Sequence, residues 1–280
     1  MKLTSTAAAI TLLCVATTAH AQRIPAGAKY VAMGSSYAAG PRVGTPADSA
    51  SDRCARSRDN YAHQLARQRH LALTDVSCGG ATTAHILGPW RELPAQLDAV
   101  DSATWLVTVT IGGNDVNYMS VLSAGACKGA PAGRTCRAAP IVPTDSTYAA
   151  LEARLTVIAR TVKTRAPKAR MVFVQYFTVL PSAGTCAVLT MSAADADAAR
   201  TMARRLAEAT ARAAKNGGAE LLPLNDLSAS HNACSSTPWI NGDLAATPPS
   251  DGTSFHPRLS GMTAVAEALD RLLGASADGH

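Results

Sequence analysis

The sequence has few aromatic residues, few charges and no long internal apolar run. Phe, Trp and Tyr together make up 4% of its 280 residues, and charged residues 16%. Beyond the N-terminus, no apolar run is as long as the roughly 18 residues that a membrane-spanning helix requires. Although the net charge is +6, the arginines are spread at helical spacing over 53–69, 154–170 and 200–212, without interleaved aromatics. This pattern predicts solvated helix faces with a weak attraction to anionic surfaces, and argues against a nucleic-acid partner.

The sequence also lacks a Cys-x-x-Cys pair, which disfavours a zinc site. Lys2, an apolar stretch over 7–15 and a small-x-small site at 19–21 predict a signal peptide. We therefore expect residues 1–21 to be removed and the mature chain, starting near Gln22, to be secreted to the periplasm or the medium.

Removal of the signal peptide takes away Cys14 and leaves six of the seven cysteines. An even number of cysteines in an exported chain favours disulfides over metal binding. The six lie along the chain in three well-separated couples, which favours the pairs Cys54–Cys78, Cys127–Cys136 and Cys186–Cys234. We expect neither a metal nor another cofactor.

The remaining residues, 22–280, are enough for one large α/β domain, and no change in composition marks a linker. Apolar runs predict strands at 28–34, 71–77, 105–111, 171–177 and 219–224. Helices are predicted at 59–69, from 115 to about 123, and at 146–165, 192–216 and 259–273, with loops over 40–57, 124–143 and 225–257. Strands that alternate with helices predict a parallel sheet covered on both faces.

Three of these strands end in glycine-rich turns that carry polar side chains. The turns are Gly34-Ser35-Ser36, Cys78-Gly79-Gly80 and Gly112-Gly113-Asn114-Asp115. Because ligands bind beyond the carboxyl ends of parallel strands, we expect the three turns to converge on one rim of the sheet.

The residue types in these turns are those that acyl transfer requires. A serine hydroxyl needs a base within hydrogen-bond reach, and His256 lies in a loop just before the last helix. A tetrahedral oxyanion needs two or three donors, which the bare N–H of Gly80 and the carboxamide of Asn114 could supply. Four other histidines, His63, His70, His85 and His231, are also candidates for the base by residue type. His63 and His70 are predicted on a solvated helix and His231 in the last long loop, with no comparable relation to a strand end.

At these residues the chain resembles the SGNH hydrolases, also called the GDSL lipase/esterase family, and above all their secreted bacterial branch with three disulfides. Gly34-Ser35-Ser36-Tyr37 is similar to the Gly-Asp-Ser-Leu block, which implies Ser36 as the nucleophile and puts Ser35 where the family usually has aspartate. Gly80, Asn114 and His256 match the glycine, Gly-x-Asn-Asp and histidine blocks.

The resemblance implies a three-layer α/β/α sandwich with a five-stranded parallel sheet. It implies an oxyanion hole made of the Ser36 and Gly80 backbone N–H groups and the Asn114 side chain. It also supports the sequential disulfide pairing.

The histidine block departs from the family pattern. The usual Asp-x-x-His would need aspartate at position 253, where this chain has Thr253, and Asp251 lies five residues before His256. Some members orient the histidine with a main-chain carbonyl instead. We therefore expect a Ser36–His256 dyad braced by the carbonyl of Thr253 or Ser254, with Asp251 as the less favoured third member.

The predicted function is that of a secreted carboxylic-ester hydrolase, a lipase or esterase that works through an acyl-enzyme. Phospholipase A and polysaccharide deacetylase are alternatives within this class, and a non-catalytic surface- or carbohydrate-binding relative is the alternative outside it. A serine peptidase is disfavoured, because neither Gly-x-Ser-x-Gly nor Ser-x-x-Lys occurs with partners. The expected partner is a small ester or lipid, with transient contact to lipid surfaces, and the chain is expected to be a monomer.

Overall fold

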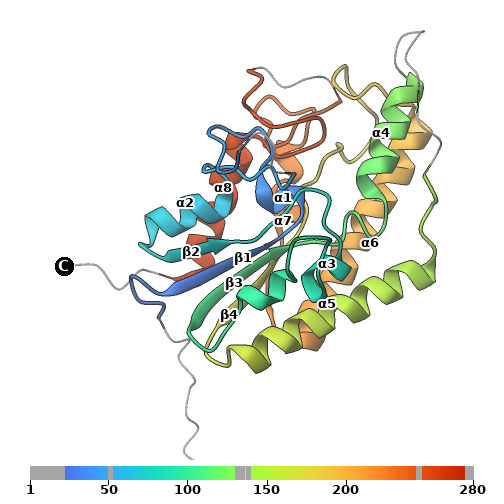
Figure 1. Ribbon diagram of the computed structural model, residues 1–280. Helices are drawn as coiled ribbons and strands as arrows, with labels where there is room; N and C mark the ends of the chain where they lie inside the picture. Colours follow the sequence, from blue (N-terminus) through green and yellow to red (C-terminus); the bar gives the residue numbers. More distant parts are fainter. Residues whose placement is uncertain (1–22, 50–52, 130–135, 137–139, 244–247, 275–280) are drawn as a thin grey trace, which may run out of the picture.

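The protein is built around one parallel sheet of five strands (Figure 1). The computed structural model describes residues 23–49, 53–129, 136, 140–243 and 248–274, so the predicted signal peptide lies outside the described residues. The strands are β1 (Lys29–Gly34), β2 (Ala72–Asp75), β3 (Thr104–Thr110), β4 (Arg170–Val174) and β5 (Glu220–Leu222). Their order in the sheet is β2-β1-β3-β4-β5, which confirms the predicted five-stranded parallel sheet.

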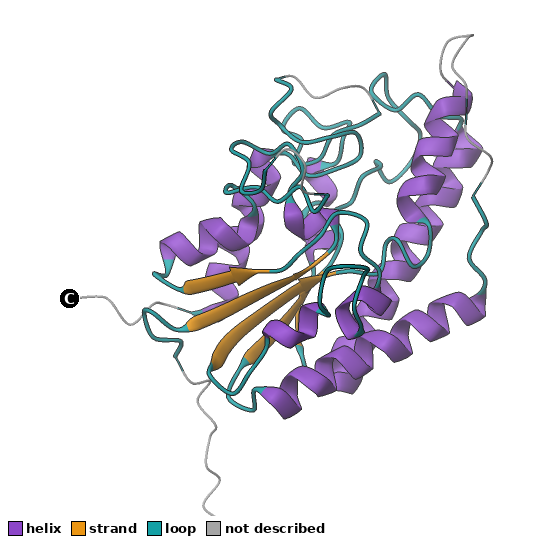
Figure 2. Ribbon diagram, in the orientation of Figure 1, coloured by secondary structure: helices purple, strands orange, loops and turns teal. Residues whose placement is uncertain are grey.

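Helices cover both faces of the sheet, and the three layers are visible in Figure 2. On one face, α2 (Tyr61–Gln68) packs against α8 (Leu259–Leu273). The other face carries α3 (Thr83–Leu87), α5 (Asp145–Arg165) and α6 (Ala193–Gly217), with α4 (Tyr118–Gly129) packed against α6. The short elements are α1 (Ser36–Ala39), α7 (Leu224–Leu227) and the 3₁₀ turns η1 (Gln96–Ala99) and η2 (Ala229–His231). Within the described helices, none is long and apolar enough to cross a membrane.

The two central strands end level with each other. Gly34 of β1 pairs with Thr110 of β3, so Ser35 and Ile111 leave the sheet side by side. The chain moves from β1 to β2 in one direction and from β2 to β3 in the other, which opens a crevice between β1 and β3 at their carboxyl ends. The sheet order therefore brings the first and third predicted turns together.

The helix faces follow the apolar spacing of the sequence. Leu151, Leu155 and Ile158 of α5 are fully buried, as predicted. Helix α6 begins where the Ser192 hydroxyl accepts the Asp195 N–H, and it ends at Gly218, whose φ of 67° is left-handed. These caps explain why the predicted bounds of α6 lie within one residue of the observed ones.

Several predicted bounds are wrong for identifiable reasons. Residues 124–129 belong to α4 instead of a loop, because Gly125 and Ala126 are buried against neighbouring segments. That helix starts at Tyr118 and not near 115, after a turn in which Asn117 has a φ of 57°. Strands β2, β4 and β5 end two or three residues early, and the loop predicted over 225–257 contains most of α7 and all of η2.

Candidate active site

The turn after β1 places two adjacent serines in different environments. Gly34 ends β1 with a φ of 143°, and a Cβ at this position would collide with the Thr110 carbonyl oxygen, so the turn requires glycine. Ser35 is buried and donates its N–H to that carbonyl at 2.9 Å. Ser36 begins α1 and is partly exposed. Only the second serine therefore presents its hydroxyl at the rim of the sheet.

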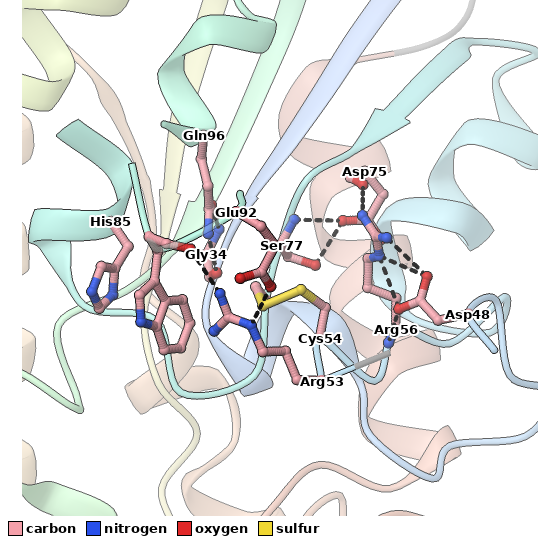
Figure 3. The surroundings of a disulfide bond; sticks show 12 residues. Gly34, Asp48, Arg53, Cys54, Arg56, Asp75, Ser77, His85, Glu92 and Gln96 are labelled. Carbon is pink, nitrogen blue, oxygen red and sulfur yellow. Dashed lines mark hydrogen bonds and ion pairs between the residues drawn. A yellow bond between two sulfur atoms is a disulfide. The ribbon is translucent and has the colours of Figure 1, made fainter. Parts of the chain in front are cut away.

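A buried glutamine, Gln96, makes two hydrogen bonds to the backbone of Gly34 in this turn. The Gln96 carboxamide accepts the Gly34 N–H at 2.7 Å and donates to the Gly34 carbonyl at 3.0 Å, as Figure 3 shows. Although β2 ends at Asp75, the Cys78 N–H also donates to the Gly34 carbonyl at 3.0 Å, so Gln96 adds to the backbone bonding of this turn. The sequence carried no signal for this role, since Gln96 lies in the connection between β2 and β3.

The structure brings His256 onto Ser36. The Nε2 atom of His256 lies 2.8 Å from the Ser36 Oγ atom, and the Nδ1 atom lies 2.8 Å from the Ser254 carbonyl oxygen. Because a carbonyl can only accept, the Nδ1 atom carries the hydrogen and the Nε2 atom is left to accept the serine proton. Burial lowers the pKa of His256 below its ordinary 6.5, against the opposing effect of the bond to Ser254. The imidazole is thus neutral at pH 7.

The alternatives for orienting His256 are separated by these contacts. The Thr253 carbonyl accepts the His256 main-chain N–H at 3.0 Å and not the ring. The Asp251 carboxylate lies elsewhere: it binds the Arg258 guanidinium at 2.7 Å and the Leu259 N–H at 2.6 Å. Of the three predicted orienting groups, the Ser254 carbonyl is the one that contacts the imidazole.

Two backbone donors are unused beside this pair. The Ser36 N–H lies in the first turn of α1, where a helix has no internal acceptor, and Gly80 lies in an exposed turn with a φ of 84°. Within the described ranges, neither N–H donates to another protein atom. Both are therefore available to an oxygen that binds at the rim.

Asn114 ties its own turn to the segment that carries Gly80. Its Nδ2 atom donates to the Ala81 carbonyl at 2.9 Å, which leaves the second hydrogen of the carboxamide available. The neighbouring Asp115 carboxylate accepts the Thr83 N–H at 3.0 Å. These bonds connect the turns after β2 and β3.

A disulfide anchors the Gly80 turn on its other side. Cys54 and Cys78 are joined by a disulfide bond (Figure 3). The Gly79 N–H donates to the Cys54 carbonyl at 3.0 Å. A Cβ at Gly80 would lie 3.4 Å from the Trp90 indole. The turn that contains Gly80 thus lies between the Cys54–Cys78 disulfide and the Trp90 indole.

The Trp90 indole is itself clamped on both faces. The His85 ring stacks on it with centroids 4.1 Å apart, and the Arg53 guanidinium carbon lies 3.9 Å from the ring centroid. A largely apolar cavity of about 370 Å³ borders Trp90, Leu93 and the Cys54–Cys78 disulfide. Neither Ser36 nor His256 lines this cavity.

The other predicted pairs are also joined in the structure, as Cys127–Cys136 and Cys186–Cys234. All six cysteines of the predicted mature chain are therefore in disulfides, and none is a thiolate available to zinc. In the part of the chain that the structure describes, no three His, Cys, Asp or Glu side chains are grouped closely enough to hold a metal ion.

The competing histidines lie away from Ser36. His70 is exposed, and His231 stacks on Trp239 with centroids 3.9 Å apart. The interpretation of His63 as a solvated side chain is wrong: it is partly buried, and its Nε2 atom lies 3.7 Å from the buried carboxylate of Asp75. Burial lowers the pKa of His63, which favours the neutral imidazole beside Asp75, and within the described residues His63 makes no hydrogen bond or ion pair with Ser36.

Two tyrosines beside the pair were missed by the sequence analysis. Tyr37 is buried, its ring centroid lies 5.2 Å from that of His256, and its hydroxyl donates to the Phe255 carbonyl. Tyr176 packs against Tyr37, with ring centroids 4.5 Å apart. Tyr37 adjoins Ser36 in the sequence and could have been noticed there, whereas nothing in the sequence marks Tyr176.

Comparison with protein families decides what this arrangement belongs to. Residues 32–264 match the model of the GDSL-like lipase/acylhydrolase family, a span that contains all three turns and His256. The chain belongs to this family. It is therefore a carboxylic-ester hydrolase of the lipase/esterase type, as the resemblance implied.

Individual relatives agree with the family assignment. The chain is 34% identical to Lipase 2 of Streptomyces coelicolor, over 97% of this chain and 96% of the relative. It is 30% identical to a lipase of Streptomyces rimosus, over 91% and 90% of the two chains. The similarity therefore extends over nearly the full length of these relatives.

Solved structures share the fold. The extracellular lipase of Streptomyces rimosus superposes with a TM-score of 0.68 at 26% identity, over 87% of this chain and 99% of that one. Phospholipase A1 from Streptomyces albidoflavus superposes with a TM-score of 0.70 at 24% identity, over 88% and 99%. The α/β/α sandwich of the GDSL lipase family is thus the fold of this chain.

Proposed function

We propose that Ser36 and His256 form a catalytic dyad that hydrolyses carboxylic esters through an acyl-enzyme. The observation that carries the proposal is the 2.8 Å contact between the Ser36 Oγ and His256 Nε2 atoms, with the Nδ1 atom held by the Ser254 carbonyl. As the Ser36 oxygen attacks the ester carbonyl, the Nε2 atom takes the hydroxyl proton. The imidazolium then gives this proton to the departing alcohol, which leaves the acyl group on Ser36.

The second half of the reaction uses the same groups in reverse. His256 takes a proton from a water molecule, the resulting hydroxide attacks the acyl carbonyl, and the proton returns to the Ser36 oxygen as the acid leaves. Ser36 is partly exposed, so water reaches the acyl-enzyme from the rim. The carbonyl of Ser254 carries no proton through the cycle, and its proposed role is to fix the ring and stabilise its charged form.

In both halves, the negative oxygen of the tetrahedral intermediate is proposed to accept the Ser36 and Gly80 N–H groups and the free hydrogen of the Asn114 carboxamide. The availability of both backbone donors and the fixed position of Asn114 support this assignment. Donors of this kind are worth about 3 kcal/mol of activation free energy each.

The proposed substrates are acyl esters of lipids and small alcohols. Lipase names among the relatives support this class, and the partial exposure of Ser36 supports turnover of short and medium acyl chains as well as long ones. Among the structural neighbours, a phospholipase A1 and an acetylxylan esterase of Geobacillus stearothermophilus keep phospholipid and polysaccharide esters as alternatives.

The proposed working form is a secreted monomer made of one domain, residues 22–280, after removal of 1–21. The three disulfides and the extracellular lipase of Streptomyces rimosus among the neighbours support secretion. The net charge of +6 supports transient contact with anionic lipid surfaces and does not require a protein partner.

Hydrolysis of p-nitrophenyl esters from acetate to palmitate tests this proposal. We expect the wild-type chain to hydrolyse the short and the long esters, Ser36→Ala to abolish turnover of all of them, and Ser35→Ala to reduce it only a few-fold. Loss with Ser35→Ala and activity with Ser36→Ala would contradict the assignment of the nucleophile. Turnover of long micellar esters alone would contradict the proposed use of short and medium acyl chains.

A further inference from the structure

Tyr176 lies at the crossing point of the two turns that carry the proposed catalytic groups. It follows β4 by two residues and is buried, with 7% of its surface exposed. Its hydroxyl accepts the Gly113 N–H at 3.0 Å and lies 3.0 Å from the Ser35 hydroxyl. One side chain from β4 thus spans the end of β3 to reach the end of β1.

The turn after β3 is shaped around this tyrosine. A Cβ at Gly113 would lie 2.7–2.8 Å from the Tyr176 ring and hydroxyl, closer than real side chains approach. Gly113 is therefore needed for the contact, and the N–H that it donates belongs to the residue directly before Asn114. Any shift of Tyr176 is transmitted to the carboxamide of Asn114 through one peptide unit.

The turn after β1 depends on the same hydroxyl. Ser35 is 1% exposed and directly precedes Ser36, at the position where the GDSL pattern has aspartate. Burial raises the pKa of Tyr176 to about 12, so the phenol keeps its proton at every working pH. While the Tyr176 hydroxyl accepts the Gly113 N–H, it can donate its own hydrogen to the Ser35 oxygen. An aspartate at position 35 would accept that hydrogen with a charged carboxylate, whereas Ser35 accepts it with a neutral hydroxyl.

We propose that Tyr176 is a positioning residue that holds the oxyanion donor Asn114 in register with the nucleophile Ser36, through hydrogen bonds to Gly113 and Ser35. The inference rests on the proposed function, because it concerns the geometry of that site. Tyr176 touches no reacting atom. Its effect appears in the transition state, where the oxyanion must meet donors from both turns at once.

Removal of the hydroxyl leaves a buried N–H of Gly113 without its acceptor. A buried donor without a partner is unfavourable, so the turn moves to satisfy it and carries Asn114 along. We expect Tyr176→Phe to lower kcat by about 10-fold or more, bounded by the roughly 10²–10³-fold loss that follows removal of a whole oxyanion donor. We expect KM for p-nitrophenyl butyrate to stay within about 2-fold of wild type, because ground-state binding does not use the oxyanion hole.

Tyr118→Phe is the matched control. Tyr118 is also a fully buried tyrosine, its ring lies edge-on to that of Tyr176 with centroids 6.4 Å apart, and its hydroxyl has no hydrogen-bond partner within the described residues. The two substitutions remove the same atom from neighbouring rings. We expect Tyr118→Phe to leave kcat unchanged within about 2-fold.

A second comparison separates positioning from general weakening of the fold. Because Ser35 and Tyr176 act through one hydrogen bond, Ser35→Ala combined with Tyr176→Phe should be no slower than Tyr176→Phe alone. An alkylboronic acid, which forms a tetrahedral adduct with the serine, should lose affinity for Tyr176→Phe by the same factor as kcat/KM. The affinity of the product butyrate should not change.

The outcomes distinguish the inference from the proposed function. If the wild-type chain hydrolyses no ester, the proposed function fails and this inference fails with it. Suppose instead that the wild type is active and Ser36→Ala is inactive. Only the role of Tyr176 is then overturned if Tyr176→Phe keeps the wild-type kcat, if its kcat falls by the same factor as that of Tyr118→Phe, or if its effect on kcat adds to that of Ser35→Ala.

Discussion

Among the residues that the structure describes, one carbonyl and no carboxylate holds the imidazole of His256. A triad aspartate stabilises the charged imidazolium and raises the pKa of the histidine, whereas a carbonyl contributes only a dipole. Burial is the larger effect on His256 and lowers its pKa below 6.5. The neutral imidazole, the proposed base, is therefore able to accept a proton over the whole neutral range.

A pH profile of kcat/KM follows from this pKa. His256 must be neutral to accept the Ser36 proton, so activity should rise with pH, reach half its plateau below pH 6.5 and stay flat through pH 7–8. The shift also means that the folded chain binds fewer protons than the unfolded chain near this pH, so His256 weakens folding as the solution is acidified. Initial rates with p-nitrophenyl butyrate between pH 4.5 and 8.5 measure the profile; a midpoint at or above 7 would contradict the carbonyl-braced dyad.

At the scale of secondary structure, the site is assembled from the ends of elements. Ser36, the proposed nucleophile, begins α1, the turns proposed to bind the oxyanion follow β2 and β3, and His256 precedes α8. Ends of parallel strands meet at one edge, so the sheet order itself determines which turns can meet. The start of α8 is fixed by the Asp251 carboxylate, which binds Arg258 and the Leu259 N–H.

Asp251→Asn should therefore affect the helix more than the chemistry. An amide keeps a single acceptor for Leu259 or Arg258 and loses the ion pair, which is partly buried and should cost about 1–3 kcal/mol of unfolding free energy. We expect kcat to stay within about 5-fold of wild type. A loss of about 10⁴ in kcat, as for the aspartate of a true triad, would show that Asp251 and not the Ser254 carbonyl orients His256. Urea unfolding measures the free energy of unfolding of Asp251→Asn, and steady-state kinetics on the same preparation measure its kcat.

At the scale of the whole molecule, the three disulfides close loops of different lengths. Their cysteines are 9, 24 and 48 residues apart. In the chain-entropy account, a longer closed loop restricts the unfolded chain more, which gives roughly 2.6, 3.4 and 4 kcal/mol respectively. The Cys54–Cys78 disulfide has an additional effect, because Cys78 lies two residues before Gly80 and anchors the turn that contains it.

Replacement of each pair by serines tests both effects. The loss of unfolding free energy should be largest for Cys186/Cys234, smaller for Cys54/Cys78 and smallest for Cys127/Cys136, as measured by guanidinium unfolding under oxidising conditions. Among the variants that fold, we expect only the Cys54/Cys78 change to lower kcat markedly. An equal loss of kcat in all three would mean that the disulfide does not support the Gly80 turn.

The sequence predicts the sheet, the three turns and the last helix, because each rests on local signals. β1 ends at Gly34, β3 is a run of apolar and β-branched residues followed by Ile111 and Gly112, and α8 has the bounds predicted for it. The contacts of Gln96 with Gly34 and of Tyr176 with Ser35 join residues 62 and 141 positions apart, and no local pattern reveals them. The choice between the Thr253 and Ser254 carbonyls depends on one peptide orientation, which only the structure supplies.

Labelling with a fluorophosphonate probe tests the central claim most directly, because the probe reacts with an activated serine whatever its natural substrate. The oxidised protein should take up one equivalent of label, peptide mapping should find it on Ser36, and His256→Ala should abolish it while Asp251→Asn should not. Label on another serine, or no label on correctly oxidised wild-type protein, would contradict the dyad and favour a surface- or carbohydrate-binding role for this fold.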